Sequence, residues 1–408
     1  MANVSSSNGL EKRPKLRFPG FDEPWNIYKA EELFKNVADK NHPTETVLTI
    51  IQGKGTLPRE QAGRNIHYDD ASLANYKKVE QGDFIIHLRS FEGGLEMANE
   101  DGIVSPAYTI LRCKNPHSSL FYEAYFHTDE FINHILSKSV EGIRDGRQIS
   151  YEAFKWLGLP YCDVSEQEKI AQLFCTLGHR IEKQQQMVDA LKKYKRGLLR
   201  KYFITDEWNT HSQWEKCKLG VYCSKIGSGK TPRGGSSVYT DHGVMFLRSQ
   251  NVLWGSLDIR DVSYIDEATN KTMLSSEVRC KDVLLNITGA SIGRSCIYLL
   301  NDRANVNQHV CIIRLSQEGK ERLLPEFLLQ QILSDHIQQQ IIDCQNGGSR
   351  EGLNFQQIAD FNIVLPSIRE QQVICGILNS FDQKILCEEA SLDCLHTLRV
   401  SLMQQLFI

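Results

Sequence analysis

Two stretches of sequence decide the fold: residues 163–203, DVSEQEKIAQLFCTLGHRIEKQQQMVDALKKYKRGLLRKYF, and residues 368–408, IREQQVICGILNSFDQKILCEEASLDCLHTLRVSLMQQLFI. Neither stretch contains proline, so each is compatible with one uninterrupted helix of roughly 60 Å. In alternating steps of four and three from Ile170 and Ile374, apolar residues occupy eight of ten positions in each stretch. This spacing is the 3.5-residue period of a coiled coil.

The two apolar seams match each other at an offset of 204 residues, including their interruptions. Polar residues break the first seam at Gln184 and Lys195, and they break the second at the equivalent Glu388 and Arg399. Two unrelated amphipathic helices would explain the apolar stripes but not the shared breaks. The predicted seam residues are Ile170, Phe174, Leu177, Ile181, Val188, Leu191, Leu198, Ile374, Leu378, Phe381, Ile385, Leu392, Leu395 and Leu402. We expect the helices to pair antiparallel, because the second must return the chain that the first carries away.

The repeat extends upstream of both helices. An apolar run ending in Pro160 precedes the first helix, and a similar run ending in Pro366 precedes the second, although the first junction is two residues longer. Further upstream, residues 82–86 align with residues 281–285, and residues 104–108 with residues 306–310. The chain therefore consists of domain, helix, domain, helix.

This order predicts an N-terminal tail and two domains, each followed by a helix. The predicted bounds are 1–15 for a flexible tail, 16–160 for the first domain, 161–204 for a central helix, 205–365 for the second domain and 366–408 for a C-terminal helix. Both domains combine short β-like runs with one helical patch. We expect an α+β fold with curved, mostly antiparallel sheets and an antiparallel coiled coil that relates the two repeats by a pseudo-twofold axis.

Composition excludes several classes of protein. Apolar residues make up 41% of the 408, but no run is long enough to span a membrane, and the polar first residues do not resemble a signal peptide. We therefore expect a cytoplasmic protein. The twelve cysteines form no CxxC, which argues against zinc or a disulfide framework. A net charge of −3 counts mildly against nucleic-acid binding but can conceal a local basic face.

Motifs for catalysis are absent from the sequence. The run Gly229-Lys230-Thr231 resembles the end of a phosphate-binding loop, but it lacks the first glycine, and Pro232 follows it. Asn115-Pro116-His117 fails the pattern of an amino-methyltransferase at its third position. Asp382 and Lys384 suggest a nuclease triplet, but they fall on the second helix. We expect a binding protein without catalytic or metal-binding residues.

Ordered motifs along nearly the whole chain resemble those of the specificity subunit of type I restriction-modification systems. The motifs are residues 18–21 before Trp25, the two proline-to-Glu-Gln junctions at 157–167 and 363–371, residues 229–232, 246–249 and 286–293, and, in the first domain, residues 89–94 and 102–108. The resemblance implies that each domain is a target-recognition domain for one half of a split, asymmetric DNA site. It also implies that the helices set the distance between the halves.

The same resemblance implies partners. These would be double-stranded DNA, two methyltransferase subunits and the translocating restriction subunits, with no membrane involved. S-adenosylmethionine, ATP and Mg²⁺ would bind to those subunits, and this chain would hold no cofactor. Two alternatives stay open: a coiled-coil adaptor whose domains bind protein, and the recognition half of a fused restriction enzyme.

Loop residues with donors, acceptors or positive charge are the candidates for DNA contact, because such groups read base edges and neutralise phosphates. They are Arg59, Arg64, Arg89, Ser90, Arg144 and Arg147 in the first domain, and Lys230, Thr231, Arg233, Arg248, Ser249, Gln250, Ser291, Arg294 and Arg350 in the second. Any one of them is also compatible with a solvated turn. Six further cations lie on the first helix between residues 192 and 201, where they would face DNA, a partner or solvent.

Overall fold

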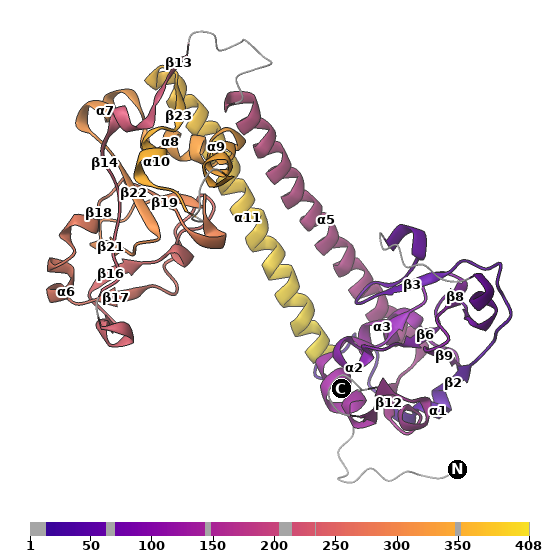
Figure 1. Ribbon diagram of the computed structural model, residues 1–408. Helices are drawn as coiled ribbons and strands as arrows, with labels where there is room; N and C mark the ends of the chain where they lie inside the picture. Colours follow the sequence, from indigo (N-terminus) through magenta and orange to yellow (C-terminus); the bar gives the residue numbers. More distant parts are fainter. Residues whose placement is uncertain are drawn as a thin grey trace. The chain divides into compact units, whose positions relative to one another are not determined.

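The computed structural model describes residues 14–62, 70–142, 148–203, 214–232, 234–346 and 352–407. The chain forms two compact units, which are described separately. Unit 1 comprises residues 1–185 and 390–408, and unit 2 comprises residues 186–389. Both long helices, α5 (Val164–Phe203) and α11 (Ile368–Leu406), contribute one half to each unit (Figure 1).

The central sheet of unit 1 has four antiparallel strands in the order β2-β9-β6-β7. Their bounds are β2 Phe34–Val37, β9 Thr109–Cys113, β6 Phe84–Ile86 and β7 Glu96–Met97. Two-stranded ladders surround this sheet: β1 (Asn26–Lys29) with β12 (Gly158–Tyr161), β3 (Leu48–Ile51) with β4 (Gly55–Pro58), β5 (Lys77–Val79) with β8 (Gly102–Val104), and β10 (Val140–Glu141) with β11 (Gln148–Ile149). The helix α3 (Ser119–Phe126) and a π-helical turn at Glu130–Ile135 replace the single helical patch that the sequence predicts.

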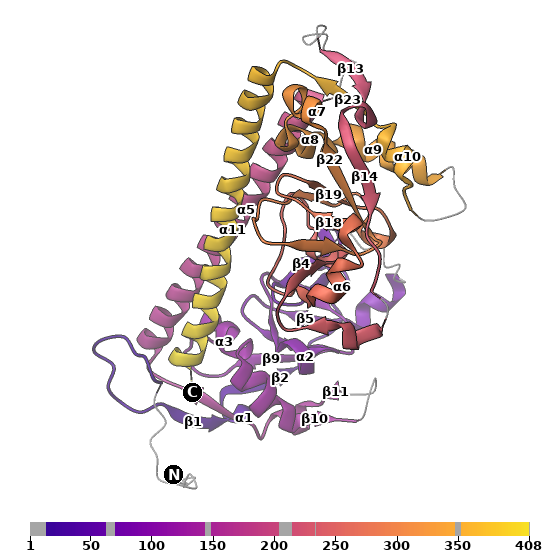
Figure 2. The same ribbon diagram turned by 90° about the vertical axis from the view of Figure 1, so that its left-hand side faces the viewer.

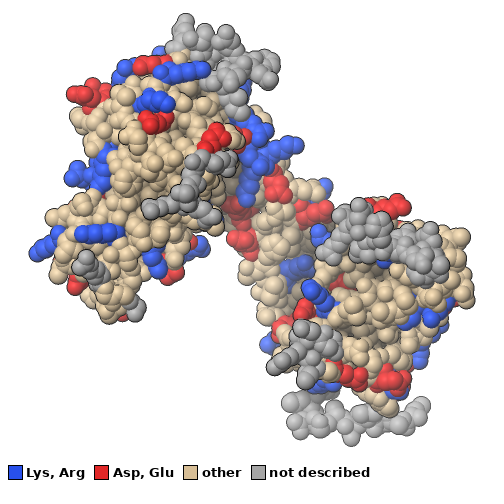
Figure 3. Space-filling model, in the orientation of Figure 1, with Lys and Arg blue, Asp and Glu red and all other residues tan. Residues whose placement is uncertain are grey.

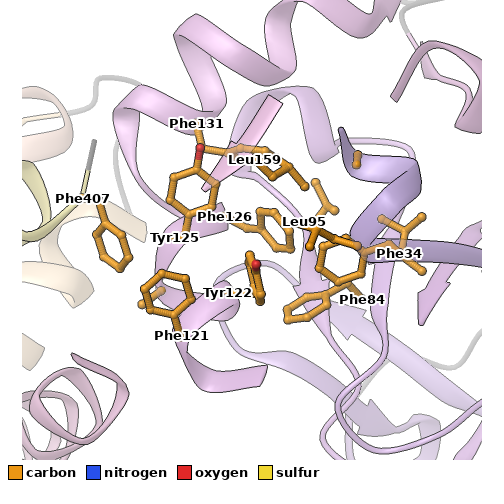
Figure 4. Packing of buried hydrophobic residues seen from close by; sticks show 14 of the residues in the cluster. Phe34, Phe84, Leu95, Phe121, Tyr122, Tyr125, Phe126, Phe131, Leu159 and Phe407 are labelled. Atoms are coloured by element: carbon orange, nitrogen blue, oxygen red, sulfur yellow. The ribbon is translucent and has the colours of Figure 1, made fainter. Parts of the chain in front are cut away.

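Unit 1 has an aromatic core. Figure 4 shows rings from α3 between the sheet residues Phe34 and Phe84 on one side and Phe407 on the other. Phe407 lies 5.4 Å from Phe121 and 5.8 Å from Phe174 of α5, measured between ring centroids. Residues from both ends of the sequence therefore close this core.

Unit 2 contains two sheets. One is antiparallel in the order β14-β22-β19-β20, and the other has the order β15-β17-β16-β21-β18, with β16 and β21 parallel. The bounds are β14 Cys223–Ser228, β22 Val310–Leu315, β19 Val283–Asn286, β20 Ser295–Ile297, β15 Tyr239–Thr240, β17 Ser263–Ile265, β16 Val244–Leu247, β21 Ala304–Val306 and β18 Glu277–Val278. The helices α7 (Gln317–Arg322), α8 (Pro325–Ile332), α9 (Asp335–Asn346) and α10 (Phe355–Ala359) gather near the ladder of β13 (Glu215–Lys218) and β23 (Asn362–Leu365) in both views (Figures 1 and 2). The expected α+β class with mostly antiparallel sheets is confirmed.

The internal repeat is visible in equivalent contacts of the two units. Strand β1 pairs with β12 just before α5, and β13 pairs with β23 just before α11. Arg112 donates two hydrogen bonds to Asp83, at 2.9 and 2.7 Å, and Arg314 does the same to Asp282, at 2.8 and 2.6 Å. Each aspartate also accepts a backbone N–H three residues before it, so each pair closes the turn leading into a central strand.

The long helices begin 204 residues apart, at Val164 and Ile368, despite the longer first junction. None of the fourteen predicted seam residues is exposed. In unit 1 Phe174, early in α5, packs against Phe407, which directly follows α11. In unit 2 the ring centroids of Tyr194 and Phe381 lie 5.1 Å apart. The pairing is antiparallel in each unit, as predicted.

The polar breaks of the seam have specific partners in unit 2. Lys195 Nζ lies 2.5 Å from Asp382 Oδ1, and only 13% of the Lys195 side chain is exposed. The Asp382 carboxylate, which the sequence places in a nuclease-like triplet, is therefore engaged within the helix pair. Lys384 instead pairs with Glu388 one turn further along α11.

All twelve cysteines are free thiols. Neither long helix, nor any other helix in the part of the chain that the structure describes, has the apolar length that crossing a bilayer requires. Within the same residues, no three His, Cys, Asp or Glu side chains come together as metal ligands would.

Candidate nucleic-acid interface

In unit 2, three loops converge on the short turn between β21 and β22. Gly229 N, after β14, donates to Asn307 O at 3.1 Å, and Asn307 N donates to Leu247 O, at the end of β16, at 3.1 Å. Ile287 N, after β19, donates to His309 O at 3.0 Å. The turn at 307–309 thus holds the ends of three strands side by side.

Gly229 permits the closest of these approaches. A Cβ atom at this position would overlap the carbonyl oxygen of Val306, so no other residue fits without moving the backbone. The glycine belongs to the Gly-Lys-Thr-Pro run, and here it brings Lys230 and Thr231 against the turn. Because a short 3₁₀ turn at Gly235–Val238 follows, this loop does not lead into the helix that a nucleotide-binding loop requires.

Side chains from the loops after β14 and β19 and from the turn itself form a hydrogen-bonded chain. The Thr231 hydroxyl donates to Gln308 Oε1. Gln308 Nε2 donates to His309 Nε2 at 3.0 Å, and His309 Nδ1 lies 2.5 Å from Thr288 Oγ1. Of these four residues, only Thr231 was predicted from the sequence.

Three candidate cations of unit 2 form no ion pair within the described part of the chain. Lys230 is exposed, whereas Arg248 and Arg294 are half-buried, and no carboxylate in the described part of the chain pairs with any of the three. The Nε of Arg248 is buried and has no hydrogen-bond partner among the residues that the structure describes. A guanidinium in this state gains from meeting an anion, because an unpaired buried donor is costly.

The remaining described candidates of unit 2 have structural contacts of their own. Ser249 is half-buried, and its carbonyl accepts a hydrogen bond from Asn286 Nδ2 at 2.8 Å. Gln250 is exposed and donates to Asp261 at 3.2 Å. Ser291 is half-buried, and its carbonyl accepts the backbone N–H of Arg294 at 3.1 Å.

In unit 1, polar and aromatic side chains gather at the corresponding strand ends. Arg59 lies over the ring of Tyr76, at 5.9 Å from its centroid, and the ring of His87, after β6, lies 6.4 Å from that of Tyr108, before β9. Burial lowers the pKa of His87 and raises the pKa of Tyr108. Burial therefore favours the neutral form of His87. Neither His87, Tyr76 nor Tyr108 was predicted, because a single aromatic residue in a loop carries no sequence signal.

Arg89 and Ser90 occupy the turn after His87. Arg89 is exposed, in keeping with a role at the surface. Ser90 is fully buried, and its hydroxyl accepts the backbone N–H of His87 at 2.9 Å, so its observed contact is within the turn. The predicted Arg64, Arg144, Arg147, Arg233 and Arg350 lie outside the described residues.

The six cations on α5 divide into two groups. Lys192, Lys195 and Arg200 pair with Glu389, Asp382 and Asp335 of unit 2, respectively. The others, Lys193, Arg196 and Lys201, are exposed. In the view of Figure 3, Lys and Arg are scattered among Asp and Glu over both units rather than gathered in one basic field. The face shown in Figure 3 therefore carries no single basic field.

The chain is similar to known proteins in sequence over most of its length. Residues 212–395 match the family of type I restriction modification DNA specificity domains. The type I restriction enzyme MjaVIII specificity subunit of Methanocaldococcus jannaschii is 21% identical over 387 residues, which cover 91% of this chain and 88% of that protein.

Two solved structures share the fold. The S subunit of a type I restriction-modification system from M. genitalium aligns with a TM-score of 0.60 and 15% identity, covering 97% of this chain and 99% of the other. A chain from a structure concerned with complex assembly and conformational transition of the type I R-M system aligns with a TM-score of 0.57 and 15% identity, covering 95% and 98%. Because both structures are only 15% identical to this chain, these similarities show a shared fold and nothing further.

Proposed function

Because this chain belongs to the type I restriction-modification specificity subunits, we propose that it reads a bipartite, asymmetric DNA site, with one half read by each unit. The observation that carries the proposal is the loop cluster around the 307–309 turn of unit 2. There an exposed lysine, two arginines without described carboxylate partners and an exposed glutamine occupy one set of strand ends. Such a set provides both phosphate contacts and base-edge donors and acceptors.

The duplicated architecture supports two readers rather than one. Each unit places polar loop residues at the ends of equivalent central strands, β6 and β9 in unit 1 and β19 and β22 in unit 2. The loop residues there differ, because Arg89 follows β6 in unit 1 where Thr288 follows β19 in unit 2. Two domains that share a fold but differ in their loop residues would recognise different half-sites, and the complete site would then be asymmetric.

We further propose that the chain is non-catalytic and cytoplasmic and acts within a complex. Two methyltransferase subunits and the restriction subunits would supply S-adenosylmethionine, ATP and Mg²⁺ chemistry, and this chain would position them on DNA. The proposal draws support from the relatives named above and from the absence of catalytic motifs in the sequence. Turnover of S-adenosylmethionine by the purified chain alone would contradict it.

The experiment that tests the function is a domain exchange. Residues 16–160 are replaced by the equivalent domain of another specificity subunit, and the chimera is expressed with the methyltransferase. Genomic adenine methylation should then change in one half of the target, while the other half and the dependence on the chain remain. A change in both halves would contradict the two-reader proposal. Methylation that is unaffected by deleting the chain would contradict any role in DNA recognition.

A further inference from the structure

The side chain of Gln308 is exposed, yet both polar atoms of its amide form hydrogen bonds within the chain. Its Oε1 accepts from Thr231, and its Nε2 donates to His309. Because an amide nitrogen only donates, His309 Nε2 must be the acceptor, and its Nδ1 then carries the proton toward Thr288. The orientation of the Gln308 amide is thereby coupled to that of His309.

The turn that carries Gln308 is itself firmly anchored. Asn307 is buried, its carbonyl accepts from Gly229, and its Oδ1 accepts the backbone N–H of His309 at 3.1 Å. On the other side of the turn, the backbone of Val306 pairs with that of Leu247 in the β16–β21 ladder. The position of the Gln308 backbone is therefore fixed as well as its side chain.

A purely structural role explains this arrangement poorly. Holding a glutamine in one rotamer costs side-chain entropy, and an exposed side chain recovers little of that cost by burial. Two of the three supporting residues, Thr231 and Thr288, also come from other loops than the turn that carries Gln308. An ordered glutamine at an exposed site is instead typical of a residue arranged in advance for a ligand.

The Gln308 amide still has the free hydrogen-bond donor and acceptor that base recognition needs. An amide oxygen accepts two hydrogen bonds and an amide nitrogen donates two, so Gln308 retains one acceptor and one donor after its contacts with Thr231 and His309. A glutamine with one free acceptor and one free donor matches the N6 amino group and N7 of adenine in the major groove. Lys230, next to Thr231, is placed to meet the phosphate backbone beside it.

We propose that Gln308 reads one adenine of the half-site recognised by unit 2, with Thr231 and His309 as positioning residues. This inference rests on the proposed function of the chain. It assigns a specificity-determining residue to unit 2 and identifies the base that this residue selects.

The test uses the complex of the full chain with its methyltransferase. Its binding is measured in competition against duplexes that carry one base-pair change at each position of the mapped target. Replacing Gln308 by alanine should reduce discrimination at one A·T position by roughly 10- to 100-fold and leave the other positions unchanged. Gln308→Glu should shift the preference at that position from adenine toward cytosine, because a carboxylate only accepts and cytosine offers the N4 donor.

The positioning residues should give smaller effects at the same position. His309→Leu and Thr231→Val should each reduce discrimination there by about 2- to 10-fold, since the glutamine must then be ordered on binding. Gln339→Ala, which removes an exposed glutamine of α9 in the same unit, is the matched control and should leave this position unchanged. Thermal unfolding of every variant is compared with the parent chain.

The outcomes separate the inference from the function on which it rests. Unchanged discrimination in Gln308→Ala, or an equal loss at every position, would overturn the reading role. If the parent complex itself shows no preference among the duplexes, the proposed function fails first.

Discussion

Gln167 and Gln371, which lie 204 residues apart, make the same buried contacts at the start of the two long helices. Gln167 Oε1 accepts the backbone N–H of Ser118 at 3.0 Å, just before α3, and Gln371 Oε1 accepts that of Leu324 at 2.9 Å, just before α8. Each Nε2 donates at 2.9 Å to a carbonyl of the junction, that of Cys162 or Pro366. The glutamine of each junction therefore fastens a long helix to the domain before it.

Replacing Gln371 by leucine should destabilise unit 2 by about 2–4 kcal/mol, because it leaves the Leu324 N–H and the carbonyls of Arg322 and Pro366 without a partner. Urea-induced unfolding measures the loss. Gln372→Leu makes the same change at the next residue, which is exposed, and should have little effect. Equal stability of the two variants would refute the role given to the buried amide.

The pair Lys195 and Asp382 should behave as a coupled unit in the seam. Lys195→Met and Asp382→Leu should each destabilise unit 2, and the double variant should lose less than the sum, with a coupling of about 0.5–1.5 kcal/mol. The coupling is modest because 36% of the Asp382 side chain is exposed. A double-mutant cycle of urea unfolding gives the value. Strict additivity would show that the two residues do not interact in solution.

Glu96 and His127 should give unit 1 a stability maximum in mildly acidic solution. Burial by itself would raise the pKa of Glu96, but hydrogen bonds from His127, Gly53 and Gly55 lower it below 4.5. Burial would likewise lower the pKa of His127, but its bonds to Glu96 and to the Glu123 carbonyl raise it above 6.5. The contribution of Glu96 is present above about pH 4.5 and is lost as pH falls through its lowered pKa. That of His127 is complete below about pH 6.5 and is lost as pH rises through its raised pKa.

The measurement is the melting temperature between pH 4 and 9. His127→Gln should abolish the part of the decline that occurs above pH 6.5. His134→Gln removes an exposed histidine of the same unit and should leave the profile as it is. An identical decline in His127→Gln and the parent chain would show that another group is responsible.

Alanine at both Arg248 and Arg294 should weaken DNA binding by the methyltransferase complex and reduce its salt dependence. Removing one phosphate contact lowers the slope of log K against log salt by about 0.9, because fewer counterions are released. Binding is measured from 50 to 200 mM salt, with Arg260→Ala as control, since Arg260 already pairs with Asp258 at 2.7 Å. If the slope and affinity stay at the parent values, the two arginines are ordinary turn residues.

The sequence predicts the helices of this protein better than its loops. The seam and its polar breaks follow from periodicity, which needs only the order of apolar residues. The equivalent pairs Asp83–Arg112 and Asp282–Arg314 were not predicted, because each joins residues about 30 positions apart.

The candidate interface shows the same limit. Loop composition selected Lys230, Thr231 and Arg248, which the structure brings to one turn of unit 2. It missed Gln308 and His309, because their role depends on a turn that three separate strands create. Ser90 was predicted from its residue type, which does not reveal that the side chain is buried and that its hydroxyl accepts a backbone N–H.

The way in which the chain is divided between the two units affects the order in which they fold during synthesis. Unit 2 is one continuous segment, Gln186–Glu389, whereas unit 1 needs residues from both sides of that segment. Leu406 and Phe407, which close the aromatic core around Trp25, leave the ribosome after all of unit 2 has been made. The domain that is translated first is thus completed second, against the usual N-to-C order. While unit 2 folds, the aromatic core of unit 1 is still incomplete. Its apolar rings are then exposed on the nascent chain, where chaperones can bind them.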